Sequence, residues 1–320
     1  MASQIFKFDF KKPASPANTA NKPLSPAHPA APAAAAATPS PGDKMEMTAE
    51  VFNNFRNVIY KLCGIYFTDS KKYLLEGRIV RRLVSRKMRT FDEYLRFIVS
   101  PEGKVELNEL FEAITINETY FFRAPQQFDA LEKTIIPELI ALKTGQTLQV
   151  FKVWVAASST GEEAYTIAII ILEKLKSKYP NVQFQVFASD INNAVIDQAK
   201  QGVYKEYAIR NVPKDLLAKY FKYDGTNYIL SDQVKRLVRF TNINLYDAAQ
   251  MRSMRGMDII FCCNVLIYFD IPSKQQVVSY LYDALNKGGY LFIGYSESLH
   301  GISKAFKLMH LSKAMAYKKE

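Results

Sequence analysis

Apolar residues recur at intervals of three and four positions along residues 46–122, which is the spacing of one buried helix face. In the first run, MTAEVFNNFRNVIYKLCG, Val51, Phe55 and Val58 lie on one stripe, and Thr48 stands where a helix N-terminus is expected. Three further segments continue the pattern: DSKKYLLEGRIVRRLVSRKMR, TFDEYLRFIVS and KVELNELFEAIT. The pattern predicts a bundle of short helices.

From about residue 148 the pattern changes to apolar, β-rich runs that alternate with helical segments. The expected strands are LQVFKVWVAAS, VQFQVFASD, MDIIFCCNVLIYF and KGGYLFIGYS, and the expected helices are GEEAYTIAIIILEKLKSKY, NNAVIDQAKQGVY and SKQQVVSYLYDAL. This alternation predicts an α/β fold with a mostly parallel, doubly wound, Rossmann-like sheet whose ligands bind at the carboxyl ends of its strands. Between residues 205 and 243, β-rich runs around Asp224 and Gly225 predict a small antiparallel insert.

Residues 1–44 hold most of the 14 prolines and few apolar residues other than alanine. Such a segment cannot bury enough surface to offset its conformational entropy, so we expect a disordered Pro/Ala-rich tail. The predicted domains are therefore this tail, an N-terminal helical domain at residues 45–125, and an α/β domain at residues 126–320 that contains the insert.

The net charge and the cysteines indicate the kind of partner and the compartment. A net charge of +11 and a pI of about 9.3 indicate an acidic partner, which could be nucleic acid, a membrane surface or an acidic protein segment. Two of the three cysteines are adjacent, at positions 262 and 263, so we expect a reducing, cytoplasmic compartment and no disulfide framework.

The histidine and hydropathy patterns argue against two further classes. The three histidines are scattered and no Cys/His spacing suits zinc, so we expect neither a metal site nor catalysis by a histidine base. No apolar run reaches the roughly 18 residues that a membrane helix needs, so membrane insertion is not expected.

The turn after the first expected strand, AASSTGEEAY, differs from a dinucleotide-binding turn. It has one glycine, Gly161, followed by Glu162 and Glu163, whose carboxylates would repel a pyrophosphate but suit a cationic amino group. Asp190 ends the second strand, where it can accept hydrogen bonds from ribose hydroxyls. A phosphate-free adenosine with a cationic tail describes S-adenosylmethionine.

Purely structural roles remain open for the same residues. Thr160 and Glu163 have the spacing of a capping box, and acidic residues favour a helix N-terminus in any case. Asp190 could act only as the cap of the turn that follows its strand.

Six blocks carry a resemblance to a known family when they are taken together and in order: TINETYFFR, WVAASSTGEEAYTIAI, FASDINNAVIDQAKQGVY, NINL, DIIFCCNVLIYFD and GGYLFIGYSESL. Over roughly residues 46–318 the chain resembles the CheR-type chemoreceptor methyltransferases. The resemblance implies an S-adenosylmethionine-dependent protein-glutamate O-methyltransferase that acts on chemotaxis receptors and releases S-adenosylhomocysteine. Residues 126–320 would then be the methyltransferase domain.

The resemblance also implies which residues contact the cofactor. They are Asn117, Thr119, Arg123, Glu162, Glu163, Asp190, Asn244, Leu245, Cys262, Cys263 and Asn264. In this scheme either or both glutamates serve the methionine end, Asp190 serves the ribose, and Asn244 and Leu245 line the adenine side. Cys263 replaces the arginine that the family commonly has in CRN, so any contact through that side chain would differ here.

The family places Arg123 and Tyr268 facing the transferred methyl group. A substrate glutamate is already ionised near pH 7 and can attack the methyl group directly, so no general base is required. Catalysis would come mainly from positioning. From the pattern alone, Tyr268 would be a core aromatic and Arg123 a surface charge, and only the resemblance favours the catalytic role.

Four of the five arginines in the segment KKYLLEGRIVRRLVSRKMR have spacings that suit one helix face: Arg78, Arg81, Arg82 and Arg86. In the family the corresponding helix faces the acidic methylation region of the receptor, so the resemblance implies electrostatic docking there. Nucleic acid is not expected as a partner, because this face lacks interleaved aromatics. We expect a monomer. The insert of some relatives captures a receptor pentapeptide, and the short turn near YDGTN resembles that of the relatives that do not.

Three alternative functions share some of these sequence features. GYSES, residues 294–298, superficially resembles a hydrolase nucleophile elbow, but it lacks the final glycine and a clear following helix. A methyltransferase that acts on RNA or on another protein would share the cofactor. A regulatory module that binds S-adenosylmethionine without turnover is the remaining alternative.

Overall fold

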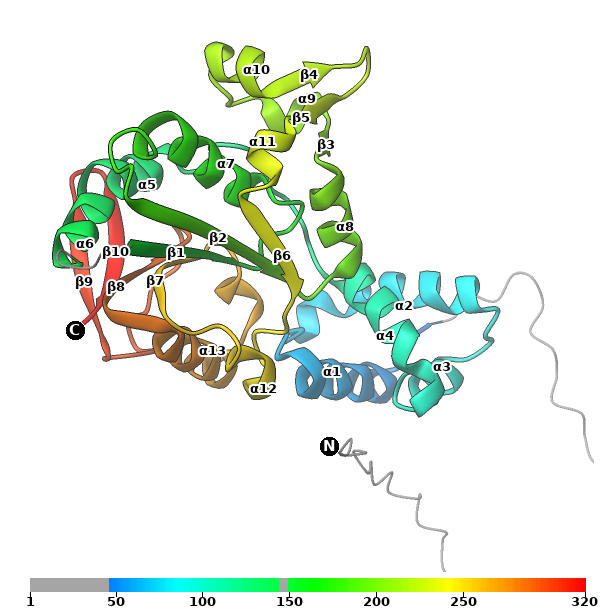
Figure 1. Ribbon diagram of the computed structural model, residues 1–320. Coiled ribbons are helices and arrows are strands. Elements are labelled where there is room, and N and C mark those ends of the chain that lie inside the picture. Colours follow the sequence, from blue (N-terminus) through cyan, green and yellow to red (C-terminus); the bar gives the residue numbers. More distant parts are fainter. Residues whose placement is uncertain (1–45, 144–148) are drawn as a thin grey trace, which may run out of the picture. The chain divides into compact units, whose positions relative to one another are not determined.

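The structure is a computed structural model that describes residues 46–143 and 149–320 (Figure 1). The tail predicted at residues 1–44 lies outside the described residues. No helix in the described ranges is long and apolar enough to cross a membrane.

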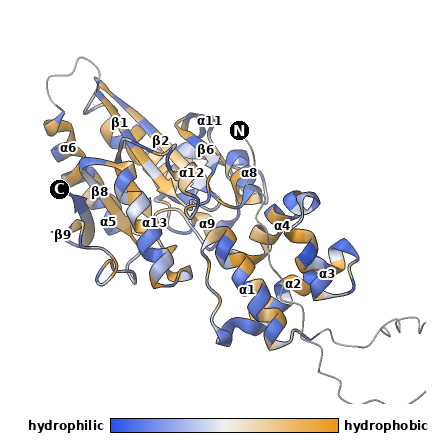
Figure 2. Ribbon diagram, turned by 90° about the horizontal axis from the view of Figure 1, so that it is seen from below, coloured by the Kyte–Doolittle hydropathy of each residue, from blue (hydrophilic) through white to orange (hydrophobic). Residues whose placement is uncertain are grey.

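Four helices precede the sheet, as the sequence predicted: α1 (Ala49–Cys63), α2 (Lys72–Arg86), α3 (Phe91–Ile98) and α4 (Lys104–Ile114). Short 3₁₀ helices at Asp69–Lys71 and Pro101–Gly103 precede α2 and α4. Thr48 and Thr90 cap α1 and α3, because their side chains accept hydrogen bonds from backbone N–H groups in the first turn. Each helix carries both apolar and polar residues (Figure 2), so it buries one face and exposes the other.

The main sheet has seven strands in the order β6-β2-β1-β7-β8-β10-β9. Their bounds are β1 (Gln149–Ala156), β2 (Val182–Asp190), β6 (Val238–Asn242), β7 (Met257–Cys262), β8 (Leu285–Ile293), β9 (Phe306–Leu311) and β10 (Ala314–Lys319). The first five in this order pair in parallel, and β10 pairs antiparallel with both β8 and β9. The predicted mostly parallel, doubly wound sheet is confirmed.

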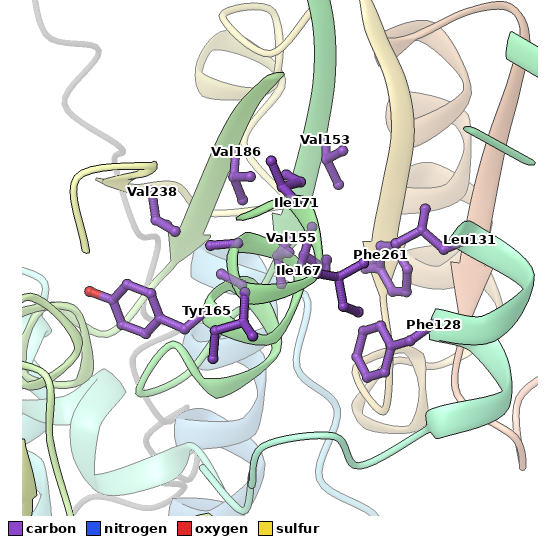
Figure 3. Packing of buried hydrophobic residues seen from close by; sticks show 14 of the residues in the cluster. Phe128, Leu131, Val153, Val155, Tyr165, Ile167, Ile171, Val186, Val238 and Phe261 are labelled. Atoms are coloured by element: carbon purple, nitrogen blue, oxygen red, sulfur yellow. The ribbon is translucent and has the colours of Figure 1, made fainter. Parts of the chain in front are cut away.

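Both faces of the sheet are buried, which explains why the central strands read as continuous apolar runs. Along β1, Val153 and Val155 enter one core while Trp154 and Ala156 enter the other. Figure 3 shows the first core, where side chains of β1, β2, β6 and β7 meet those of two helical segments.

Helices cover both faces of the sheet. One face packs against α5 (Pro125–Ala130), α6 (Ile136–Leu142) and α7 (Glu162–Ile170), with π-helical turns at Leu131–Ile135 and Ile171–Leu175. The other face packs against α12 (Ala248–Met251) and α13 (Ile271–Ala284), and α8 (Asn193–Gln201) contacts β2 and β6. The carboxyl ends of the five parallel strands lie at one edge of this sheet.

The insert is a three-stranded antiparallel sheet in the order β3-β5-β4, with bounds β3 (Val203–Tyr204), β4 (Phe221–Tyr223) and β5 (Tyr228–Leu230). Three short helices accompany it: α9 (Glu206–Ile209), α10 (Lys214–Tyr220) and α11 (Asp232–Lys235). The hairpin predicted around Asp224 and Gly225 is confirmed between β4 and β5. The predicted end at residue 243 is wrong, because residues 238–242 form β6 and pair in parallel with β2.

Candidate functional site

A cavity of about 250 Å³ lies at the carboxyl ends of β1, β2, β6 and β7, the edge where ligands bind in doubly wound sheets. The segment that follows α4, residues 115–124, forms another wall and is called the connector below. Of the residues that the sequence predicted for the site, the following line this cavity: Asn117, Thr119, Arg123, Glu163, Asp190, Asn244, Leu245, Cys263, Asn264 and Tyr268.

Aromatic residues fix the connector to the α/β part of the chain. Phe121 is fully buried, with ring centroids 4.9 and 5.1 Å from those of Tyr204 and Phe221 in the insert, and its N–H donates to the carbonyl of Ala208. The connector is also tied to the turn after β1, where the Ser159 hydroxyl donates to the Asn117 carbonyl at 3.1 Å. These anchors leave the polar residues of the connector facing the cavity.

Arg123 and Tyr268 border the cavity from different elements. The Arg123 Nη1 donates to the carbonyl of Glu118 at 2.8 Å, which holds the guanidinium against the connector backbone. Tyr268 closes a 3₁₀ helix, Leu266–Tyr268, and its carbonyl accepts from the Tyr66 N–H at 3.0 Å. Burial raises the pKa of the Tyr268 phenol, and the positive charge of Arg123 opposes that rise.

Backbone strain concentrates around the cavity. Four residues that are not glycine have left-handed φ angles there: Phe122 (55°), Ala157 (56°), Ser159 (50°) and Asn264 (61°). Such conformations cost free energy and persist only where the surrounding contacts enforce them, which is common at functional sites.

The two adjacent glutamates of α7 point in different directions. Glu163 lines the cavity, whereas Glu162 does not, because consecutive helix residues are about 100° apart around the axis. Glu162 instead accepts hydrogen bonds from the Thr160 hydroxyl at 2.7 and 2.9 Å. The predicted capping box of Thr160 with Glu163 is therefore wrong, and Gly161 occupies the cap position with φ of 90°.

Burial raises the pKa of the Glu163 carboxyl to about 7. The neighbouring Cys263 thiol and the positive charge of Arg123 both oppose the rise. In the described ranges Glu163 forms no ion pair with a lysine or arginine. The wall therefore presents a carboxylate that lacks a counter-ion.

Asp190 lies at the end of β2 with both carboxylate oxygens engaged. One oxygen accepts from the Ser159 N–H and the other from the Asn192 N–H, each at 2.9 Å. Burial raises the Asp190 pKa while these N–H groups oppose the rise. The bond to Asn192 closes an Asx turn. Asn192, and not Asp190, caps α8, and the Asp190 side chain lines the cavity.

The segment after β6 forms an apolar side of the cavity. Leu245 is buried, and Ile191, Ile243 and Phe269 line the same side. The Asn244 side chain donates to the Leu62 carbonyl of α1 at 2.7 Å, so the amide mainly joins this segment to the helices.

One correction concerns Cys262, the last residue of β7. Cys262 is fully buried in the core between the sheet and helices α12 and α13, and it does not line the cavity. Its neighbour Cys263 does, because consecutive strand residues face opposite sides. The Cys263 Sγ lies 3.6 Å from Gln127 Oε1. Burial raises the pKa of the Cys263 thiol, so the side chain is neutral and does not replace the charge of an arginine.

Sequence reasoning missed Glu297, whose carboxylate accepts hydrogen bonds from three backbone N–H groups, including those of Asn264 and Ile267. It also missed Ser158, which lines the cavity and whose buried hydroxyl has no hydrogen-bond partner in the part of the chain that the structure describes. Ser158 lies in the turn after the first strand, so its position there was the available clue. For Glu297 the clue was an acidic residue just after the last parallel strand.

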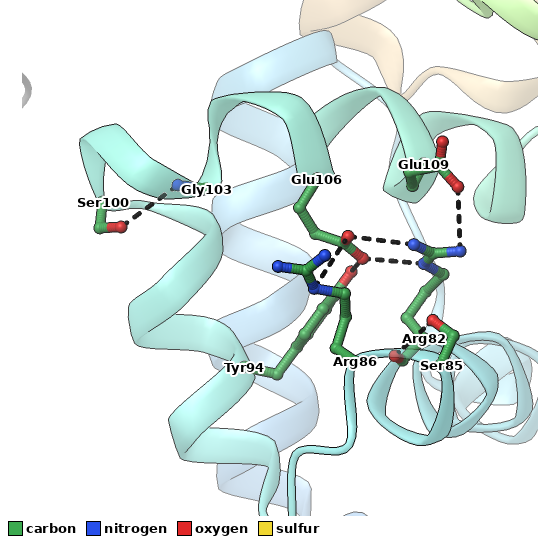
Figure 4. Close-up of polar contacts among 8 residues, drawn as sticks. All are labelled: Arg82, Ser85, Arg86, Tyr94, Ser100, Gly103, Glu106 and Glu109. Atoms are coloured by element: carbon green, nitrogen blue, oxygen red, sulfur yellow. Dashed lines mark hydrogen bonds and ion pairs between the residues drawn. The ribbon is translucent and has the colours of Figure 1, made fainter.

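The four arginines of α2 do not form one exposed face, which corrects the predicted docking surface. Arg78 is buried and donates to the Ile114 carbonyl. Arg82 and Arg86 both pair with the buried carboxylate of Glu106, which also accepts from the Tyr94 hydroxyl (Figure 4). Arg81 is exposed.

Comparison with known proteins adds two family matches. Residues 117–315 match the family described as "CheR methyltransferase, SAM binding domain", and residues 50–115 match "CheR methyltransferase, all-alpha domain". Chemotaxis protein methyltransferase 2 of Vibrio cholerae is 36% identical over 279 residues, covering 87% of this chain and 95% of that protein. The chemotaxis protein methyltransferase of Borreliella burgdorferi is 33% identical over 258 residues, covering 80% and 91%.

Proposed function

Because the chain belongs to the CheR methyltransferase family, we propose that it transfers a methyl group from S-adenosylmethionine to glutamate side chains of chemotaxis receptors. The products are glutamyl methyl esters and S-adenosylhomocysteine. One observation carries the proposal: a single cavity is bordered by two carboxylates, Glu163 and Asp190, and by Arg123 and Tyr268.

The wall of the cavity suits S-adenosylmethionine. Glu163, which lacks a counter-ion, fits the cationic methionine end, and Asp190 fits the ribose hydroxyls. The apolar side formed by Ile243 and Leu245 fits the adenine ring, and the unpartnered hydroxyl of Ser158 offers a further hydrogen bond. When bound, S-adenosylmethionine supplies a methyl group on a positively charged sulfur, which a glutamate carboxylate can accept.

The chain's own residues then act by positioning. The guanidinium of Arg123 can hold the substrate carboxylate by charge-assisted hydrogen bonds, and the Tyr268 hydroxyl can donate to it, since its raised pKa keeps the phenol protonated near neutral pH. The substrate glutamate needs no base, because its carboxyl is ionised near pH 7. Orientation of the carboxylate oxygen toward the methyl carbon is the main catalytic contribution.

The helical domain, residues 45–125, would meet the receptor, and residues 126–320 would hold the cofactor. Arg81 is the best candidate for electrostatic contact with the acidic methylation region, because it is the exposed member of the four arginines on α2 that lacks an ion pair in the described ranges. The receptor glutamate would then enter the cavity beside the connector.

The test is transfer of radiolabelled methyl groups from S-adenosylmethionine to membranes that contain chemoreceptors, followed by base treatment of the product. We expect label on the receptor band that base releases as methanol, since carboxyl methyl esters are base-labile. Arg123→Ala should lower the rate about 100-fold, as loss of one positioned donor typically does. Base-stable label, or a labelled RNA in place of the receptor, would contradict the proposal.

A further inference from the structure

The segment GYSES, residues 294–298, takes no part in the function proposed above, yet it contains a buried carboxylate close to the cavity. Glu297 is 9% exposed. Its Oε2 accepts from the N–H groups of Gly294 at 2.7 Å and Asn264 at 2.8 Å, and its Oε1 accepts from the N–H of Ile267 at 3.2 Å. One side chain thus joins the end of β8 to the loop after β7.

The loop that Glu297 holds carries several residues of the cavity wall, among them Asn264, Ile267 and Tyr268. Within this loop Asn264 has a left-handed φ of 61°, so outside contacts help to fix the path of the loop. Glu297 itself does not line the cavity. It can therefore influence the reaction through the loop that it holds, and through its negative charge, which helps to raise the pKa of the Glu163 carboxyl and of the Tyr268 phenol.

Gly294 leaves room for this arrangement. A Cβ on Gly294 would lie 2.7 Å from Asn264 Nδ2, 2.8 Å from Glu297 Oε2 and 2.9 Å from Asn264 N, all closer than real Cβ contacts allow. Only glycine lets the two loops approach to hydrogen-bond distance. The GYSES segment thus supplies both the space, at Gly294, and the acceptor, at Glu297.

The three N–H groups need a carboxylate and not an amide. An ionised carboxylate only accepts, with about four acceptor directions, whereas a glutamine amide has one accepting oxygen and one donating nitrogen. In Glu297→Gln the amide oxygen can still serve Gly294 and Asn264. The amide nitrogen would then oppose the Ile267 N–H, donor against donor, in the 3₁₀ helix that carries Tyr268.

We propose that Glu297 is a positioning residue for methyl transfer, which holds the 3₁₀ helix Leu266–Tyr268 so that the Tyr268 side chain faces the cavity. The inference rests on the role of Tyr268 in the proposed function. A second restraint on this helix is the bond from the Tyr66 N–H to the Tyr268 carbonyl, which fixes the backbone from the side of the N-terminal helices.

The test is a double-mutant cycle with Glu297→Gln and Tyr268→Phe in the full chain. The readouts are kcat and KM for receptor methylation, the dissociation constant of S-adenosylhomocysteine, and the melting temperature, which shows that each variant is folded in the assay. We expect Glu297→Gln to lower kcat about tenfold and to leave cofactor affinity within about twofold. In the Tyr268→Phe background the same substitution should change kcat by less than about twofold.

Asp258→Asn is the matched control, because Asp258 is an equally buried carboxylate at the opposite end of β7. It accepts from the Lys152 N–H, the Lys143 Nζ and the Asn286 side chain, each at 2.8 Å. We expect it to lower the melting temperature and to leave kcat unchanged in both backgrounds. If Glu297→Gln does not fold, Gly294→Ala takes its place in the cycle, since its Cβ displaces the same carboxylate.

Equal loss of kcat from Glu297→Gln in both backgrounds would overturn the inference, as would parallel losses of kcat and cofactor affinity. A Tyr268→Phe variant with full activity would remove Tyr268 from the site and the inference with it. Failure of the proposed function would already be visible in the unsubstituted protein, which would then not methylate receptors.

Discussion

Glu163 is the residue on which the proposed cofactor site depends most directly. Its pKa of about 7 in the free protein means that a substantial fraction is protonated at neutral pH, because burial disfavours the charged form. A cationic ligand binds the ionised form. Ligand affinity and proton release are therefore linked, and affinity should rise with pH until the carboxyl is fully ionised.

The affinity for S-adenosylhomocysteine, whose amino group stays protonated near neutral pH, should increase about tenfold between pH 6 and pH 8. The direction follows from the ionised fraction of Glu163, which is small below the pKa of about 7 and nearly complete above it. In Glu163→Gln the affinity should be lower and independent of pH over this range. Isothermal titration calorimetry at several pH values measures the affinity of the unsubstituted protein and of Glu163→Gln.

Glu162→Gln is the control for this titration. Burial raises the pKa of Glu162 to about 7 as well, but its carboxylate is turned away from the cavity and bound to the Thr160 hydroxyl. The variant should keep the pH dependence of the unsubstituted protein. Loss of that dependence in Glu162→Gln, with retention in Glu163→Gln, would show that the wrong glutamate has been assigned.

At the residue scale, the sequence predicted which residues meet at one cavity better than it predicted the directions of individual side chains. Asp190 and Glu163 follow strands whose ends meet at one edge, so their approach was predictable from the α/β pattern. The errors fell on immediate neighbours, Glu162 beside Glu163 and Cys262 beside Cys263. Adjacent side chains on a helix or strand point to different sides, and a pattern with a glutamate or a cysteine at both positions does not say which one faces the ligand.

Helix α2 illustrates the same limit at the scale of an element. The spacing of its arginines predicted one exposed basic face, yet the face is divided between solvent and the buried carboxylate of Glu106 (Figure 4). Glu106 lies on α4, about two dozen residues farther along the chain, and a partner at that distance leaves no trace in the periodicity of α2 itself. Because Arg82 pairs with Glu106 and Arg81 faces solvent, we expect opposite effects on stability and on receptor binding when each is replaced.

Arg82→Ala should destabilise the protein by about 3 kcal/mol, because it leaves the buried charge of Glu106 without its main partner. The side chain of Arg82 is 17% exposed and that of Glu106 is 2% exposed, so water cannot replace the lost bonds. Arg81→Ala should change the free energy of unfolding by less than about 0.5 kcal/mol. Urea denaturation of the two variants gives the comparison.

The KM for the receptor should depend on Arg81 and not on Arg82, the reverse of the order expected for stability. Arg81→Ala should raise KM for the receptor several-fold with cofactor affinity unchanged, whereas folded Arg82→Ala should keep the KM of the unsubstituted protein. A receptor KM that is insensitive to Arg81 would exclude this residue from the docking surface.

The insert is joined to the connector by a cation–π stack. The guanidinium carbon of Arg210 lies 3.4 Å from the ring centroid of Tyr120 and 3.6 Å from that of Tyr207. The Tyr207 hydroxyl donates to the Glu118 side chain at 3.0 Å, and the Glu118 carbonyl accepts from Arg123. The insert therefore supports the part of the connector that presents Arg123.

Arg210→Ala should lower kcat several-fold by loosening Arg123, and it should cost less than about 1 kcal/mol of stability because the stack is largely exposed. Steady-state methylation and thermal melting test the two parts. Arg236→Ala is the control, since Arg236 is an exposed arginine of the same region that takes no part in the stack. Equal effects of the two substitutions on kcat would assign the loss to net charge and not to the stack.

At the scale of the whole molecule, the α/β architecture was the most predictable feature. Two buried faces produce continuous apolar strands, and alternation with helices fixes a parallel order. The end of the insert was not predictable, because β6 is an edge strand whose outer positions, such as Arg239 and Thr241, look like those of a small antiparallel sheet. Only its pairing with β2 assigns it to the main sheet.

The net charge of +11 predicts that long-range attraction assists encounter with an acidic receptor segment. KM for the receptor should therefore rise several-fold when the salt concentration increases from about 0.05 to 0.3 M, over which the screening length falls by more than half. KM for S-adenosylmethionine should change less than twofold, because that site is enclosed. Initial rates at several salt concentrations test this, and equal salt dependence of the two KM values would contradict it.

The central claim is that a glutamate carboxylate of a receptor is the group that accepts the methyl. Mass spectrometry of receptor peptides, after reaction with the full chain and S-adenosylmethionine, tests it most directly. The account predicts methylation on glutamate side chains, and its loss when Arg123→Ala replaces the unsubstituted protein. Methyl groups found on lysine or arginine, or on no receptor residue at all, would contradict the account.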